Sequence, residues 1–227
     1  MADINQIMMK TKLTNLLLLF SVNLIAQDTL SHRNNIIPVQ AEAFAGNKRF
    51  ALQTVVIKPF SFKSKFNFLS VVQTVNNYKN NTKDFDLVNV THVDYNLYRG
   101  FGPSVGINTN NAIGSAPNVG LNYVYTHPAI TFIINPDFVV TSGHNIEGIS
   151  IIEYKPHIKN KFSFYTRMQA FYSYNIDEKF HERSFITARL GLTYGRFTFG
   201  AGANYDWYGP SKVLKENYGP YLMYLFL

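Results

Sequence analysis

The chain is 227 residues long, which suits one sizeable all-β domain. Charged residues make up only 15% of it and aromatic residues another 15%, a composition that excludes an intrinsically disordered chain, while the absence of cysteine excludes disulfides, thiolate metal sites and a cysteine nucleophile. The formal net charge is +7, but the basic residues are spread over expected turns and loops, so we do not expect nucleic-acid binding.

The N-terminus has the pattern of a secretory signal peptide. A basic segment at 9–12 precedes an apolar run at 13–25, and small residues follow the run. A membrane-spanning helix is the alternative, but the run is too short for one and is interrupted by polar residues. The expected boundaries are a signal peptide at 1–27, with translation starting at Met1, Met8 or Met9, and a polar lead-in at 28–35.

From residue 36 the chain alternates between apolar and polar residues with a period of two, interrupted by turn-forming segments. This alternation predicts antiparallel strands with one face toward lipid and the other toward a polar interior. Residues 36–227 are therefore expected to form one closed, up-and-down transmembrane β-barrel; a soluble sandwich or calyx is the alternative. The twelve expected strands are 36–44, 49–58, 65–76, 85–98, 101–109, 118–126, 129–140, 146–155, 162–174, 184–194, 197–207 and 218–227.

The clearest pair of strands lies at 184–208. Two alternating segments meet at Gly195-Arg196, a connection short enough for a tight hairpin turn. In the second segment one row is apolar and ends in Tyr205 and Trp207, while the other row consists of Thr, Gly, Asn and Asp. An aromatic row facing lipid beside a small polar row facing the lumen is typical of a barrel strand.

The C-terminal segment 218–227 has the features of a closing strand. Its aromatic and leucine residues from Tyr218 to Phe226 share one row, which we expect to face lipid and to be recognised by the barrel-assembly machinery. An even number of strands places both termini of the chain on the periplasmic side. The connections on that side are expected to be short, and those on the outer side longer and more polar.

Several stretches resemble small outer-membrane β-barrel proteins of the Bacteroidota. They are the end of the signal peptide at Ala26-Gln27 and the segments 37–50, 180–195 and 203–219. The resemblance covers essentially the mature chain and implies a barrel in the outer membrane of a Gram-negative cell. Its surroundings would be outer-membrane lipid and lipopolysaccharide. No established role goes with these motifs.

Strand parity predicts four charged side chains inside the barrel. Glu147, Glu153, Arg167 and Arg189 all fall in rows that alternate with apolar residues, and Glu153 is expected nearly opposite Arg167. A charged side chain inside a barrel must be paired with an opposite charge or hydrated. The four residues are therefore interpreted either as a salt-bridge network that plugs the lumen or as a constriction that selects solutes by charge.

The function expected from this pattern is a small porin-like or transport channel with a basic-leaning lumen. The alternative is a non-conducting structural or interaction barrel with a plugged lumen. The remote alternative is a membrane-embedded lipid hydrolase or acyltransferase.

The histidines give little support to catalysis. The outer-membrane phospholipase has His and Ser two residues apart on one strand, and this chain has no such pair, so we expect no enzyme and no cofactor. His92 and Asp94 share a strand face without an evident serine. His181-Glu182 is placed in a loop, where a divalent ion is one interpretation and a solvated loop the favoured one.

Overall fold

The computed structural model describes residues 37–61, 63–79 and 85–227. The predicted signal peptide, the lead-in and Ile36 lie outside these residues. None of the described residues forms a helix long and apolar enough to cross a membrane. The strands are β1 (Val39–Ala45), β2 (Arg49–Pro59), β3 (Phe66–Asn77), β4 (Asp86–Tyr95), β5 (Phe101–Asn110), β6 (Gly114–His127), β7 (Ile130–Val139), β8 (Asn145–Tyr154), β9 (His157–Lys159), β10 (Phe162–Asn175), β11 (Phe180–Tyr194), β12 (Phe197–Tyr208) and β13 (Val213–Phe226).

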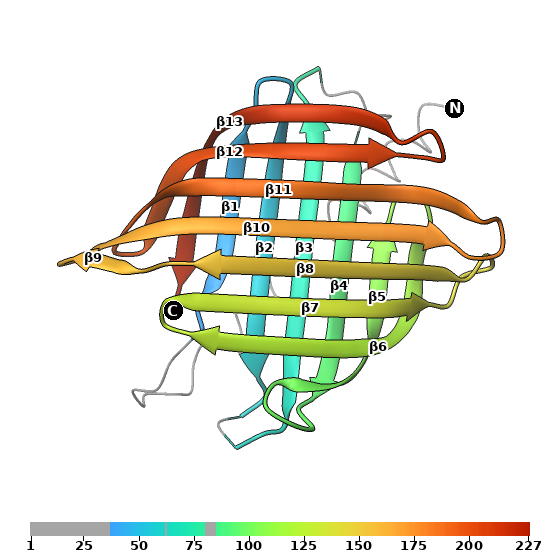
Figure 1. Cartoon of the computed structure of the whole chain (residues 1–227), viewed down its shortest axis with the longest axis horizontal. Helices are drawn as coiled ribbons and strands as arrows, with labels where there is room; N and C mark the ends of the chain where they lie inside the picture. The colour runs from blue at the N-terminus through green and yellow to red at the C-terminus, as the bar shows by residue number, and fades with distance from the viewer. Residues whose placement is uncertain (1–36, 62, 80–84) are drawn as a thin grey trace, which may run out of the picture. The chain divides into compact units, whose positions relative to one another are not determined.

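Twelve of these strands close into an antiparallel barrel. Neighbours in sequence pair with one another, β13 returns to pair with β1, and β10 pairs with both β8 and β11. The short β9 is an additional strand that pairs with the end of β10. Figure 1 shows β7, β8, β10 and β11 crossing in front of β2 and β3. The predicted closed up-and-down barrel is confirmed.

Some strands extend further than the alternation predicts. β6 begins at Gly114 instead of 118, β11 at Phe180 instead of 184, and β13 at Val213 instead of 218. The polar start of β13 nevertheless pairs residue by residue with the end of β12. Pairing with a formed neighbour outweighs local turn-like composition, so the connections opposite the termini are shorter than expected.

The outer face carries an apolar band with aromatic residues at both ends. At the end that holds the termini, aromatic side chains pack in cross-strand pairs: Phe66 with Tyr95, Phe162 with Tyr194, and Phe197 with Tyr224. At the other end Tyr205 stacks on Trp207 with ring centroids 6.3 Å apart. Two aromatic girdles around an apolar band are typical of a β-barrel in the outer membrane. This protein resides in that membrane.

The inner face is packed with side chains. One buried apolar cluster draws residues from β2, β3, β4, β7, β8, β10 and β11, and includes Leu69, Ile133 and Phe185, each 0% exposed. A second cluster contains Phe44, Tyr165 and Met223. Apolar side chains therefore meet inside the barrel beside the polar residues described next.

Candidate functional site

The four charged residues predicted to face the interior all do so. Glu147, Glu153, Arg167 and Arg189 are buried, with at most 7% of any of them exposed. They do not form one network, however. Arg167 and Arg189 share one partner that the sequence analysis did not select, while Glu153 and Glu147 belong to two other groups of contacts.

Glu42 on β1 is the partner of both arginines. Arg189 donates from Nε to Glu42 Oε1 over 2.9 Å, and Arg167 donates from Nη2 to Glu42 Oε2. The Arg189 guanidinium also lies over the Phe44 ring, 4.3 Å from its centroid. Glu42 could have been selected from the sequence, because the row Gln40, Glu42, Phe44 alternates with alanines.

Glu153 lies beside Arg167 as predicted but is bound by other groups. The two residues are Cα partners on β8 and β10. The Glu153 carboxylate accepts hydrogen bonds from the Tyr165 hydroxyl at 2.6 Å and from Gln40 Nε2 at 2.9 Å. The predicted position of Glu153 opposite Arg167 is confirmed, but the described residues contain no direct ion pair between the two side chains.

A chain of glutamines crosses the lumen at the next level. Gln53 Nε2 donates to Gln169 Oε1 over 2.5 Å, and Gln169 Nε2 donates to Gln73 Oε1 over 3.4 Å. Gln169 and Gln73 come from β10 and β3, which are six strands apart in the ring and therefore directly opposite. Side chains from opposite walls thus touch in the middle of the barrel.

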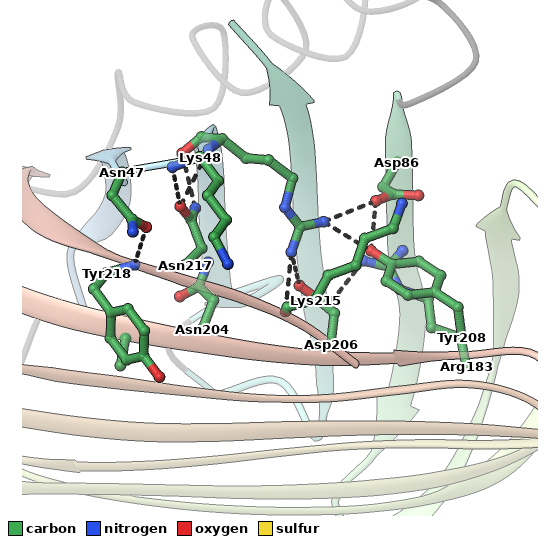
Figure 2. A network of polar contacts seen from close by, with 12 residues as sticks. Asn47, Lys48, Asp86, Arg183, Asn204, Asp206, Tyr208, Lys215, Asn217 and Tyr218 are labelled. Carbon is green, nitrogen blue, oxygen red and sulfur yellow. Dashed lines mark hydrogen bonds and ion pairs between the residues drawn. The ribbon is translucent and has the colours of Figure 1, made fainter. Parts of the chain in front are cut away.

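A second arginine centre lies toward the end opposite the termini. Asp206 accepts hydrogen bonds from Arg49 at 2.7 Å and from Arg183 at 3.0 Å. Tyr208 donates to Asp86 over 2.5 Å, and Arg49 contacts that aspartate at 3.3 Å. Figure 2 shows Asp86, Arg183, Asp206 and Tyr208 converging.

Glu147 belongs to a cluster of carboxylates and amides. Its carboxylate accepts from Asn108, Asn110 and Ser173 at 2.9, 2.6 and 3.0 Å. Asn108 also donates to Asp137, and the Ser173 hydroxyl, which has one proton, lies 2.8 Å from Glu182 as an alternative acceptor. No lysine or arginine of the described residues forms an ion pair with any of these three carboxylates.

More carboxylates than arginines are buried inside the barrel, contrary to the expectation of a basic-leaning lumen. The difference arises because many lysines lie at turns, outside the barrel wall. The buried arginines are Arg49, Arg167, Arg183 and Arg189, whereas the buried carboxylates are Glu42, Asp94, Asp137, Glu147, Glu153 and Asp206.

A hollow of about 610 Å³ opens at the end of the barrel opposite the termini. It is lined by polar groups that include Asn145, Asn175, Glu178 and Glu182. Glu182 also accepts from Asn145 and Ser173, so the floor of the hollow meets the carboxylate–amide cluster.

The histidines lie in different environments from those expected. His92 and Asp94 are both buried inward, and the Asp94 carboxylate accepts hydrogen bonds from Asn67 and Asn122. His181 lies on β11 instead of in a loop. Among the described residues no group of His, Cys, Asp or Glu is arranged to hold a metal ion.

Comparisons with known proteins give structural likeness only. No protein-family model and no curated protein matches the chain. The structure of the NanC porin is 15% identical, with a TM-score of 0.48 over 85% of this chain and 100% of its own. A loop-deletion form of OmpT, an outer membrane protein of Vibrio cholerae, is 8% identical, with a TM-score of 0.36 over 83% of this chain and 97% of its own.

Proposed function

We propose that this protein is a non-conducting outer-membrane barrel whose interior is closed by its own side chains. The observation that carries the proposal is the Gln53–Gln169–Gln73 chain, which joins opposite walls. Apolar packing and the Glu42 ion pairs fill the levels around it. Wider barrels tend to keep a lumen free for water, whereas an interior of this kind is a packed core.

In this proposal Glu42, Arg167 and Arg189 hold the barrel together instead of selecting solutes. Transfer of a charge from water into the interior costs more free energy than one surface ion pair contributes. Each buried charge therefore needs its partner and its hydrogen bonds. Interactions with other molecules would then occur at the outer wall and at the connections between strands. Lipopolysaccharide and phospholipid are the partners expected there, and insertion would use the C-terminal strand.

Planar-bilayer recording of the purified full chain tests this proposal. We expect no ion conductance above the bare bilayer over a range of salts and voltages. A general porin reconstituted in the same bilayers is the positive control. Steady single-channel conductance would reject the closed barrel.

The porin-like channel predicted from the sequence is the second candidate. The hollow of about 610 Å³ at the end opposite the termini favours it, because solute vestibules are polar and open outward. The same recordings would support it if they showed steps whose reversal potential under a salt gradient indicated cation preference, as the acidic lining predicts.

A further inference from the structure

A β-bulge in β11 brings a histidine and a serine together on one face. Ser173 on β10 is paired with Arg183 and the next residue, Tyr174, with His181, so Glu182 is an extra residue in β11. Glu182 and Arg183 both turn inward, to Ser173 and Asp206. A bulge reverses the alternation beyond it. His181 and Ser184, three residues apart, consequently share the lipid-facing side.

The two side chains are in hydrogen-bond contact. Ser184 Oγ lies 2.9 Å from His181 Nε2, and His181 Nδ1 lies 2.9 Å from the backbone oxygen of Gly209. A carbonyl oxygen only accepts, so Nδ1 carries the proton and Nε2 of the neutral ring accepts from the serine hydroxyl. This is the tautomer that allows a histidine to take a proton from serine.

Gly209 is itself fixed in position. Its N–H donates to the Glu182 carbonyl over 2.7 Å, which ties the turn after β12 to the bulge. Its φ is +67°, in the left-handed region that favours glycine. The carbonyl thus orients the His181 ring, as the third group of a catalytic triad orients its base.

Ser184 opens onto an apolar groove in the outer wall. The groove has a volume of about 390 Å³, and Pro136, Gly148, Ala170, Tyr172, Ile186 and Trp207 line it with Ser184. This volume falls within the range of about 300–1,000 Å³ typical of small-molecule sites. The groove arises where small residues on β7, β8, β10 and β11 interrupt a wall of large apolar ones.

The position of the serine fits an ester at the edge of the bilayer. Ser184 is the Cα partner of Trp207 on one side and of Tyr172 on the other. Trp and Tyr of the girdle mark the boundary between hydrocarbon and headgroups. A lipid whose acyl chain occupies the groove would therefore present its carbonyl near Ser184, with the indole N–H and the phenol O–H as donors to a developing oxyanion.

We propose that His181 and Ser184 form a catalytic pair that hydrolyses long-chain acyl esters of membrane lipids. Ser184 Oγ attacks the carbonyl carbon while its proton passes to His181 Nε2. The bond from that carbon to the alcohol oxygen then breaks, and the alcohol leaves with the proton. Water attacks the acyl-serine, giving one proton to Nε2; the bond to Ser184 breaks, its hydroxyl regains the proton, and the fatty acid leaves. This activity does not depend on whether the lumen conducts.

The proposal differs from the expectation of no enzyme, which rested on the absence of a His and a Ser two residues apart on one strand. Under strict alternation, residues three apart on a strand face opposite sides, and only a pair two apart could meet. Because the bulge adds one residue, a spacing of three residues here places both side chains on the same face, as a spacing of two does in a regular strand.

The test uses the purified full chain in detergent and in vesicles, with a fluorophosphonate reagent as the probe for an activated serine. We expect the reagent to modify Ser184, identified by mass spectrometry. Ser184→Ala should abolish the modification, and His181→Gln should slow it by about 100-fold or more, the lower end of what a general base contributes. Ser150→Ala, which removes another serine of the same groove, is the matched control and should react as the wild type does.

Fatty-acid release from vesicles then tests the substrate class. One set contains phosphatidylethanolamine and phosphatidylglycerol, and a second contains lipopolysaccharide, so the two sources of acyl ester are distinguished. A Cβ at Gly148 would have its nearest neighbour at 3.6 Å, so Gly148→Leu should fill the groove, retain serine labelling and lose release. The heat-dependent shift in electrophoretic mobility confirms that each variant is folded.

Absence of serine modification in folded wild-type protein would overturn the catalytic pair. Modification without fatty-acid release from either set of vesicles would overturn the assignment to lipid esters. Release that persists in Ser184→Ala would show that another group or a contaminant is responsible.

Discussion

Arg189 on β11 and Glu42 on β1, three strands apart in the ring, are joined by a 2.9 Å hydrogen bond between Nε and Oε1. Because Arg167 binds the other oxygen of the same carboxylate, Glu42 is the ion-pair partner of two buried guanidinium groups. The interior of this barrel consequently depends on one carboxylate from its first strand.

Glu42→Gln should destabilise the barrel strongly. The variant removes the ion-pair partner of two buried arginines, and breaking a buried pair in this way costs about 3–5 kcal/mol. Equilibrium unfolding in urea, in detergent micelles or vesicles, measures the change. Glu178→Gln, at an exposed turn position, is the control and should leave the unfolding midpoint unchanged. Equal midpoints for the two variants would contradict the role given to Glu42.

Tyr165→Phe tests the other glutamate at this end of the barrel. The substitution removes the hydroxyl that donates to Glu153 over 2.6 Å and retains the ring that packs in the second apolar cluster. A hydrogen bond to a charged group contributes about 1.5–3 kcal/mol, so a loss of that size is expected in the same unfolding measurement. Tyr154→Phe on the lipid face is the matched control. A loss no larger than that of the control would argue against a buried, charged Glu153.

Sequence reasoning predicted which residues face inward but not which of them meet. Alternation is a local property of each strand, so it placed Glu147, Glu153, Arg167 and Arg189 in the interior. The Glu42–Arg167 contact joins residues 125 positions apart on strands that are not neighbours. Which strands approach across the interior depends on closure and on side-chain length, and a period of two contains neither.

The proposed pair of His181 and Ser184 could not be predicted from the sequence for a different physical reason. Alternation predicts side-chain direction only while the register is unbroken, and the bulge at Glu182 breaks it. The Gly209 carbonyl that orients His181 belongs to another hairpin, so no spacing along β11 could identify it. The run from His181 to Ser184 was the available signal, but the sequence divides it between an expected loop, which holds His181 and Glu182, and an expected strand that begins at Ser184.

Arg167→Glu separates a structural role from a selective one. The new carboxylate would face Glu42 and lie beside Glu153, so it should lower the free energy of unfolding by at least as much as Glu42→Gln does. In planar bilayers the variant should conduct no more ions than the wild type, because apolar side chains fill the interior of the barrel around Arg167. Arg196→Glu in the exposed turn between β11 and β12 is the control for charge alone. A conducting variant with normal stability would identify Arg167 as part of a solute pathway.

Two strand glycines should respond in opposite ways to the same added methyl group. A Cβ at Gly106 would overlap the Thr91 carbonyl oxygen and lie 2.6 Å from the His92 Cα, so Gly106→Ala must push β5 away from β4. Overpacking of this kind costs about 1–3 kcal/mol.

Gly148→Ala adds its methyl group to the open groove, where the nearest atom would be 3.6 Å away. Alanine also has fewer conformations than glycine in the unfolded chain, which favours the folded state by about 0.4–1 kcal/mol. The urea midpoint should therefore fall for Gly106→Ala and stay level or rise for Gly148→Ala. If both variants were equally destabilised, the groove would be closed where Gly148 lies, and the space assigned to a lipid chain beside Ser184 would be absent.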